Sequence, residues 1–469
     1  MPSDGEDIAV AQISSRRLIL RSYWIVVLFA LPLWWSTTSI ERLSLPATRV
    51  RSQQNRQLRL PIEIALDSCP SHAALVPQIL SEFTSWTNSH NDRWGHLDVH
   101  LVNNSDTSPY LGTASRYNVK LGCCRSTCAN GHPEITLSDR NMQLGIPKEG
   151  IRASYVVRTL EDLLIPPVPS VQAQFSPRYR LAFSLLNEDA AVGGAASAWA
   201  IEDAIDGYLT PTLTELSIVH NFTIETVTGP RTAADSEWKG YELDQDELKT
   251  FINSAEWTLA SSVNNDIVLH FILFVPTHSG VRWTRSSTNA FIIPQWGGVV
   301  IYNPPDSRIS HPFAIFRSQL HSLLGVPSVP PNITVKTDSV LSAWQLDALL
   351  RRRGVENTKG TIEALNSIMK LVDRISNMPV RADVRGDVLG ALDALDDVHT
   401  HRLSPASLLS RSSEALTLSS RAFFNPGMLA MLYFPVEHKY AIRAWRQERR
   451  KKSGGDTKRD SGEEVSKDD

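Results

Sequence analysis

The sequence has few cysteines and almost no net charge. Four cysteines in 469 residues are too few for a disulfide-dense secreted scaffold. The 47 Lys and Arg nearly balance the 50 Asp and Glu, which leaves a formal net charge of -3, so no overall basic field indicates nucleic acid as a partner. With 42% hydrophobic and 21% charged residues, the chain is not disordered, collagen-like or a many-span membrane protein. Its length allows a large core in about three folding units, or one or two larger ones.

Motifs of common enzyme classes are also absent from the sequence. It contains no G-x-S-x-G, no H-E-x-x-H, no P-loop and no G-x-G-x-x-G, the patterns that place nucleophiles, zinc ligands or phosphate-binding loops. The 13 histidines are scattered. We therefore predict no catalytic residue, no cofactor and no metal site.

The four cysteines allow three interpretations. Cys123, Cys124 and Cys128 form a cluster, whereas Cys69 lies apart. In an oxidising compartment disulfide bonds are the expected outcome for all four. A zinc site would need two spaced pairs such as C-x-x-C, which are missing, and no motif supports a catalytic thiol.

Two acidic groups could be read as metal sites. Asp244 and Asp246 resemble the acidic triplet with which many glycosyltransferases hold a metal, but capping of a helix at 247–251 explains them better. Three further aspartates lie three and four residues apart on one predicted helix, where a solvated stripe is the favoured interpretation: Asp393, Asp396 and Asp397.

The N-terminal region predicts a membrane anchor. Residues 23–35 carry no charge, and the uncharged segment 22–40 is long enough as a helix to span about 28 Å, close to the hydrocarbon thickness of a bilayer. Because positive charge stays on the cytosolic side, Arg16, Arg17 and Arg21 predict a cytosolic tail at 1–21 and a lumenal or extracellular remainder. The alternative is a cleaved signal peptide, for which the long acidic tail is atypical. Both interpretations place most of the chain beyond the membrane.

Glycosylation sequons agree with that placement. Asn103, Asn221 and Asn332 each begin an N-x-S/T triplet, the acceptor pattern for N-glycans in secretory compartments. A single triplet often arises by chance, but three of them behind a hydrophobic segment carry more weight.

The remaining chain predicts an α/β fold. After a polar linker at 41–60, strand-like and helix-like runs alternate over 61–335, which favours an α/β domain with a central mixed sheet. Residues 336–442 form a helical section, and the charged tail 443–469 is expected to be disordered. Predicted strands cover 61–66, 97–102, 118–121, 135–137, 179–186, 223–227, 267–275 and 299–302. Predicted helices cover 72–86, 151–164, 195–209 (ended by Pro211), 345–353, 361–375, 384–398 and 405–421.

Two apolar segments have no assigned role. Residues 294–298 read PQWGG, in which two glycines indicate a tight turn or a close backbone approach; a turn before a strand and a contact with a partner explain it equally well. Residues 428–435 read MLAMLYFP, and core packing is favoured over a membrane rim or a partner surface.

Several segments together resemble one family. They are RRLILRSYWIVVLFALPLWWSTTSIERLSLP at 16–46, FSLLNED at 183–189, PQWGGVVIYNPP at 294–305, FRSQLHSLLGVP at 316–327, WQLDALLRRR at 344–353, ISNMPV at 375–380 and AFFNPGMLAMLYFPVEHKYAI at 422–442. In this order they resemble the PIG-S family (Gpi17 in yeast), a subunit of the GPI transamidase. None of them carries a chemical mechanism.

The resemblance implies a membrane-tethered lumenal α/β protein of the endoplasmic reticulum. It implies a complex that attaches preassembled GPI anchors to the C-termini of proproteins, in which a separate caspase-like subunit carries the catalytic Cys-His pair. The partners implied are that subunit, its membrane partners and the reticulum membrane. The family has a second spanning segment after the region matching 439–442, whereas here the charged residues 443–449 follow. A truncated gene product is favoured over a one-anchor variant.

Two alternatives from other classes stay open at this point. A type II lumenal glycosyltransferase would use Asp244 and Asp246, and would bind a nucleotide sugar in a metal-dependent way. A secreted soluble binding protein would require cleavage of the N-terminal segment.

Overall fold

The structure is a computed structural model of the 469-residue chain. It describes residues 16, 18–32, 42–90, 94, 96–103, 115–123, 133–147, 150–187, 201–232, 242–243, 266–275, 282–283, 289–302, 310–336, 339–375, 378–400 and 403–428. The chain divides into two compact units. We call residues 57–358 with 395–413 the sheet unit, and residues 1–56, 359–394 and 414–469 the helical unit.

The first sheet of the sheet unit has six strands in the order β13-β4-β5-β3-β1-β2. All neighbouring strands are parallel except β4 and β5, which form an antiparallel hairpin. The strands are β1 (Leu60–Ser68), β2 (Leu97–Asn103), β3 (Ser115–Cys123), β4 (Glu134–Ser138), β5 (Asn141–Ile146) and β13 (Ile333–Val335).

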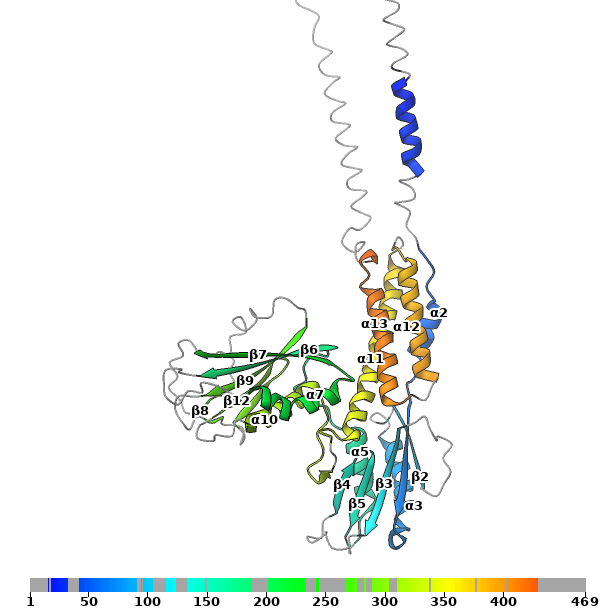
Figure 1. Ribbon diagram of the computed structural model, residues 1–469. Coiled ribbons are helices and arrows are strands. Elements are labelled where there is room, and N and C mark those ends of the chain that lie inside the picture. The colour runs from blue at the N-terminus through cyan, green and yellow to red at the C-terminus, as the bar shows by residue number, and fades with distance from the viewer. Residues whose placement is uncertain are drawn as a thin grey trace, which may run out of the picture. The chain divides into compact units, whose positions relative to one another are not determined.

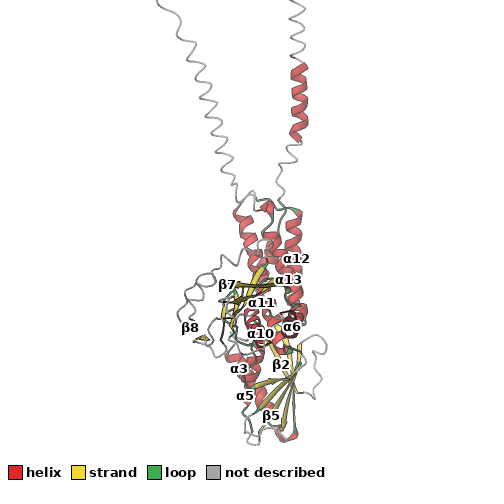
Figure 2. Ribbon diagram, turned by 60° about the vertical axis from the view of Figure 1, so that its left-hand side comes forward, coloured by secondary structure: helices red, strands yellow, loops and turns green. Residues whose placement is uncertain are grey.

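Two helices cover one face of this sheet: α3 (Leu75–Ser89) and α5 (Ala153–Leu164). Ile62, Ile64 and Leu66 lie on one face of β1 and are buried in the same core as Ile79 of α3 and Leu160 of α5. Both helices appear beside the first sheet in Figure 2. A short 3₁₀ turn, η1 (Pro70–His72), follows β1.

The second sheet has five strands in the order β11-β12-β9-β6-β7. Strands β12, β9, β6 and β7 are parallel, and β11 pairs with β12 in an antiparallel hairpin. The strands are β6 (Arg178–Asn187), β7 (Asn221–Thr232), β9 (Ile267–Val275), β11 (Ala290–Ile293) and β12 (Gly297–Ile301). A separate parallel pair joins β8 (Glu242–Leu243) to β10 (Arg282–Trp283).

Helices α6 (Ile201–Tyr208), α7 (Thr210–Leu216) and α10 (Ser310–Leu324) contribute to the core of the second sheet. At its centre four phenylalanine rings form five close pairs with centroids 5.1–6.0 Å apart, within the usual range for stacked and edge-to-face pairs. They are Phe183, Phe271, Phe313 and Phe316.

Three long helices follow the sheets: α11 (Ala343–Arg374), α12 (Ala382–Thr400) and α13 (Pro405–Phe423), which run side by side in Figure 1. The helical unit holds the second half of α11, most of α12 and the end of α13, together with α2 (Ala47–Gln54) and the helix of residues 18–32. A Cβ atom at Gly390 would lie 3.0 Å from the Leu418 side chain, so the missing side chain lets α12 and α13 approach closely.

The structure confirms the α/β class and the helical C-terminal section, but the prediction of one central sheet is wrong. The strands divide between two mixed sheets, a division that period-2 patterning does not encode. The predicted break between 353 and 361 is also wrong, because α11 continues through Gly354 and Gly360. These glycines face Leu408 and Leu416 of α13, with Cβ positions 2.7 and 3.2 Å from those side chains.

Pro211 is a further correction. It does not simply end a helix, because it sits at the start of α7, where a missing N–H costs nothing. Residues 195–200 lie outside the described residues, as do the tail 443–469 and most of 428–435. The predicted domain boundaries stay predictions.

Candidate functional site

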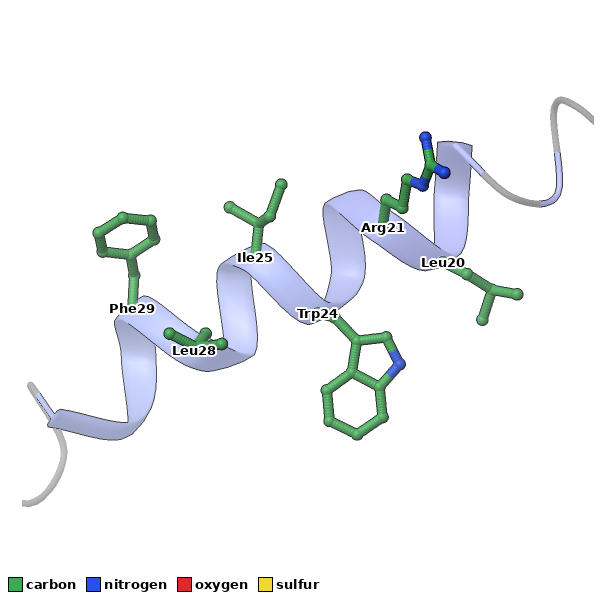
Figure 3. Close-up of a pocket in the computed structure, with 6 residues that line it drawn as sticks. All are labelled: Leu20, Arg21, Trp24, Ile25, Leu28 and Phe29. Atoms are coloured by element: carbon green, nitrogen blue, oxygen red, sulfur yellow. The ribbon is translucent and has the colours of Figure 1, made fainter.

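Most of the exposed large hydrophobic residues that the structure describes lie on the helix of residues 18–32. Leu20, Trp24, Leu28 and Phe29 expose 57, 62, 69 and 75% of their area. Together with Arg21 and Ile25 they line a hollow that this helix forms alone (Figure 3), so it is open apolar surface and not a ligand cavity. Within the described part of the chain, no helix combines the length and the apolar character needed to cross a membrane.

The acidic candidates do not form a metal site where they can be observed. Asp393 accepts a 2.8 Å hydrogen bond from the Arg49 guanidinium in the helical unit, and Asp397 lies 3.8 Å from Arg411 in the sheet unit. Across the described ranges no group of three or more His, Cys, Asp or Glu could hold a metal ion. Asp244 and Asp246 lie outside the described residues.

The structure describes only part of the predicted cysteine set. Cys69 follows β1, its backbone N–H donates to the Leu121 carbonyl of β3 at 3.0 Å, and its Sγ lies 3.2 Å from Ser71 Oγ. Cys123 is the last residue of β3, so the register of β1 and β3 brings the two backbones to the same end of the sheet. Cys124 and Cys128 lie outside the described residues, and the disulfides stay a prediction.

The three sequon asparagines are all exposed. Asn103 is the last residue of β2, Asn221 is the first residue of β7, and Asn332 immediately precedes β13. The Asn332 side-chain amide donates a 2.9 Å hydrogen bond to the Tyr155 hydroxyl. All three are therefore accessible to a modifying enzyme, although their use as glycan sites stays a prediction.

The PQWGG segment forms the turn between β11 and β12. Gln295 has a positive φ of 66°, and the Trp296 ring stacks on His270 with a centroid distance of 4.8 Å. A Cβ atom on Gly298 would lie 2.1 Å from Gln319 Oε1. Because Gly298 has no side chain, the Gln319 amide fits beside it and donates to the Phe291 and Val299 carbonyls at 3.0 and 3.1 Å. The segment therefore joins α10 to both strands of the hairpin.

A buried polar cluster joins β3 to the start of α11. The Tyr117 hydroxyl donates to Asp347 Oδ2 at 2.7 Å and accepts from Arg351 Nη1 at 2.7 Å. Arg140 donates two hydrogen bonds to the same Asp347 carboxylate, at 2.9 and 3.1 Å. The centroids of the Trp344 and Tyr117 rings lie 4.1 Å apart. Burial raises the pKa of the Tyr117 phenol, so this hydroxyl stays protonated and acts as a structural donor.

The next two arginines of α11 secure the end of α10. Arg352 donates to the Gly325 carbonyl at 2.5 Å and Arg353 to the Leu324 carbonyl at 3.3 Å, which satisfies acceptors that a helix end leaves free. Arg353 also lies over the Phe175 ring at 4.7 Å. The WQLDALLRRR segment is therefore a connector of packed elements, consistent with its lack of recognisable chemistry.

Sequence reasoning missed this polar cluster as a unit. One signal was present, since Trp344, Asp347 and Arg351 recur at spacings of three and four on an otherwise apolar helix face. Their partners, Tyr117 of β3 and Arg140 of the turn between β4 and β5, lie more than 200 positions away in the chain, and no local pattern identifies such partners.

Comparison with known proteins identifies the family. The family model described as phosphatidylinositol-glycan biosynthesis class S protein, PIG-S, matches residues 21–165 and 168–443. The human GPI-anchor transamidase component PIGS is 26% identical, with 89% of each chain covered. The Schizosaccharomyces pombe GPI transamidase component PIG-S homolog is 27% identical over 92% of this chain and 81% of its own length. The Saccharomyces cerevisiae GPI transamidase component GPI17 is 23% identical over 89% and 86%. The chain belongs to the PIG-S family.

Proposed function

We propose that this chain is a subunit of the GPI transamidase complex, which attaches preassembled GPI anchors to proprotein C-termini. The observation that carries the proposal is the match to PIG-S over almost the whole chain, shared with relatives named as transamidase components in a mammal and two yeasts. The comparisons give no support to the glycosyltransferase alternative.

Within that complex we assign the chain a role other than supplying the nucleophile. The family segments that the structure describes connect packed elements. The Gln319 side chain packs against Gly298, and Arg352 and Arg353 donate hydrogen bonds to carbonyls at the end of α10. The caspase-like chemistry expected of a partner subunit needs a Cys-His pair. The partners proposed are this catalytic subunit and its membrane partners.

For location we propose the membrane of the endoplasmic reticulum, with the N-terminus cytosolic and most of the chain lumenal. Support comes from the exposed apolar surface of helix 18–32, from the arginines before it, and from the uncharged sequence that continues to residue 40. The part of this anchor at 33–40 lies outside the described residues.

The test of the complex is affinity purification of the tagged full chain from solubilised microsomes. We expect the other transamidase subunits to be recovered with it in fixed ratio. Recovery of folded, glycosylated chain without them contradicts the proposal.

The anchor is tested separately with Ile25→Lys plus Leu28→Lys. Two central charges cost about 5–7 kcal/mol of insertion free energy at about 2.5–3.5 kcal/mol each, so alkaline carbonate should release the variant and leave the parent in the membrane pellet. The matched control Ile25→Leu plus Leu28→Ile keeps the segment apolar and should stay in the pellet. Equal release of parent and variant by carbonate would contradict the proposed membrane anchor.

A further inference from the structure

The three sequon asparagines share a position that the sequence alone does not reveal: each lies at the end of an outermost strand of a sheet or directly next to it. Strands β2 and β13 are the two edges of the first sheet, and β7 is one edge of the second. Asn103 ends β2, Asn221 begins β7, and Asn332 directly precedes β13. Among the described residues no further strand pairs with the outer side of these three edges.

Unprotected strand edges are a hazard in proportion to their length and apolar character. An outermost strand presents unpaired backbone N–H and C=O groups on which another chain can add a strand. β7 is the longest of the three, with 12 residues, and its Ile224 is 37% exposed. β2 has seven residues and β13 only three. The remaining edge of these two sheets, β11, has four residues and no sequon.

We propose that N-glycans on Asn103, Asn221 and Asn332 protect these three sheet edges from strand addition by a second copy of the chain. An N-glycan is bulky and solubilising, so attached at a strand terminus it occupies the space through which a second edge strand would approach. The proposal rests on the lumenal placement proposed above. β7 depends on its glycan most, and β13 least.

The geometry of each acceptor is compatible with the transfer. The Asn side chains are exposed, as are the hydroxyl residues Thr223 and Thr334 of the second and third sequons. In the transfer a lipid pyrophosphate-linked oligosaccharide loses its C1–O bond to phosphate, C1 bonds to Asn Nδ2, and one Nδ2 proton leaves with the pyrophosphate. The other N–H remains, so Asn332 can keep its hydrogen bond to Tyr155.

The first measurement is the occupancy of each site in the full chain expressed in microsomes. We expect endoglycosidase to shift the parent by three mobility steps. The Thr223→Ala variant should shift by only two mobility steps, because its second sequon is destroyed. Thr223→Ser keeps a valid sequon and should still shift by three. The same pair of changes at Thr334 reports on Asn332.

The second measurement is self-association of the detergent-solubilised chain by size-exclusion chromatography. Thr223→Ala should shift to larger species and Thr223→Ser should not, and Thr334→Ala should shift less than Thr223→Ala. Adding Ile224→Lys to Thr223→Ala should restore the parent elution, because a charged side chain protects an edge without a glycan. Enzymatic removal of glycans from the folded parent should produce the same association, which separates the effect from a folding defect.

The outcomes separate this proposal from the proposed function. A chain that co-purifies with transamidase subunits but carries no glycan at these positions overturns the edge proposal alone. The edge proposal is also overturned if the parent carries glycans at all three sites, but Thr223→Ala and the enzymatically deglycosylated chain both elute like the parent. Unglycosylated chain recovered without transamidase subunits overturns both proposals.

Discussion

The buried hydroxyl of Tyr117 offers the sharpest test of how the sheet unit is held together. Tyr117→Phe removes one oxygen atom and leaves the ring packed against Trp344. The lost bonds are the one donated to Asp347 and the one accepted from Arg351, both 2.7 Å long. Hydrogen bonds to charged groups contribute about 1.5–3 kcal/mol each, so the expected destabilisation is about 3–6 kcal/mol.

Tyr179→Phe is the matched control. Tyr179 is equally buried, and its hydroxyl also makes two bonds, but to neutral backbone: it donates to the Gln174 carbonyl at 2.6 Å and accepts from the Ser176 N–H at 3.0 Å. Neutral bonds contribute about 0.5–1.5 kcal/mol each, which gives about 1–3 kcal/mol for the pair.

Native-state hydrogen exchange of the full chain in detergent measures both effects locally. Since about 1.4 kcal/mol is a factor of ten, Tyr117→Phe should accelerate exchange in β3 and the first half of α11 by at least about a hundredfold. Tyr179→Phe should act around β6 and by less. Equal effects of the two variants, or an acceleration below about threefold at β3, would refute the assignment of Asp347 and Arg351 as the stabilising partners.

Two further predictions concern protonation and close packing. Burial lowers the pKa of three histidines of the sheet unit, His220, His270 and His321, to about 4 from 6.5. The unfolded chain therefore binds more protons, and stability should fall as pH falls from about 6.5 to about 4, by about 1.4 kcal/mol per pH unit for each histidine; thermal unfolding of the full chain across this range measures the slope. Gly298→Ala should displace the Gln319 amide, lose its two carbonyl contacts and cost about 1–3 kcal/mol, seen as a lower thermal midpoint.

Each of these has a control. His270→Gln removes one titrating group and should flatten the pH slope by about one third; an unchanged slope would assign the pH dependence elsewhere. Gly122→Ala meets nothing within 4 Å and should leave the midpoint unchanged. Adding Gln319→Ala to Gly298→Ala should relieve the clash without restoring the bonds, so a midpoint below that of Gly298→Ala alone would contradict the packing argument.

The sequence predicted the elements better than their assembly. Alternating apolar residues located β1 closely and a nearly continuous apolar run located β9, because side-chain period and burial are local properties. These patterns did not separate the strands into two sheets, since strand order depends on long-range pairing such as β13 with β4. Helix α10 was not predicted as an element, and its amide contact through Gln319 becomes visible only once the β11–β12 hairpin is in place.

The candidate site was predictable in part for a similar reason. An uncharged N-terminal segment and three sequons are linear signals, so they could be identified directly from the sequence. The buried cluster around Asp347 and the edge positions of the sequons depend on the fold, because each requires partners or neighbours from distant strands.

The most direct measurement of the central claim is a replacement assay in cells depleted of their own copy of this chain. The account predicts that depletion leaves proproteins with uncleaved C-terminal signals and removes GPI-anchored proteins from the cell surface, and that the full chain restores both. Normal surface levels of GPI-anchored proteins after complete depletion would contradict the assignment to the transamidase.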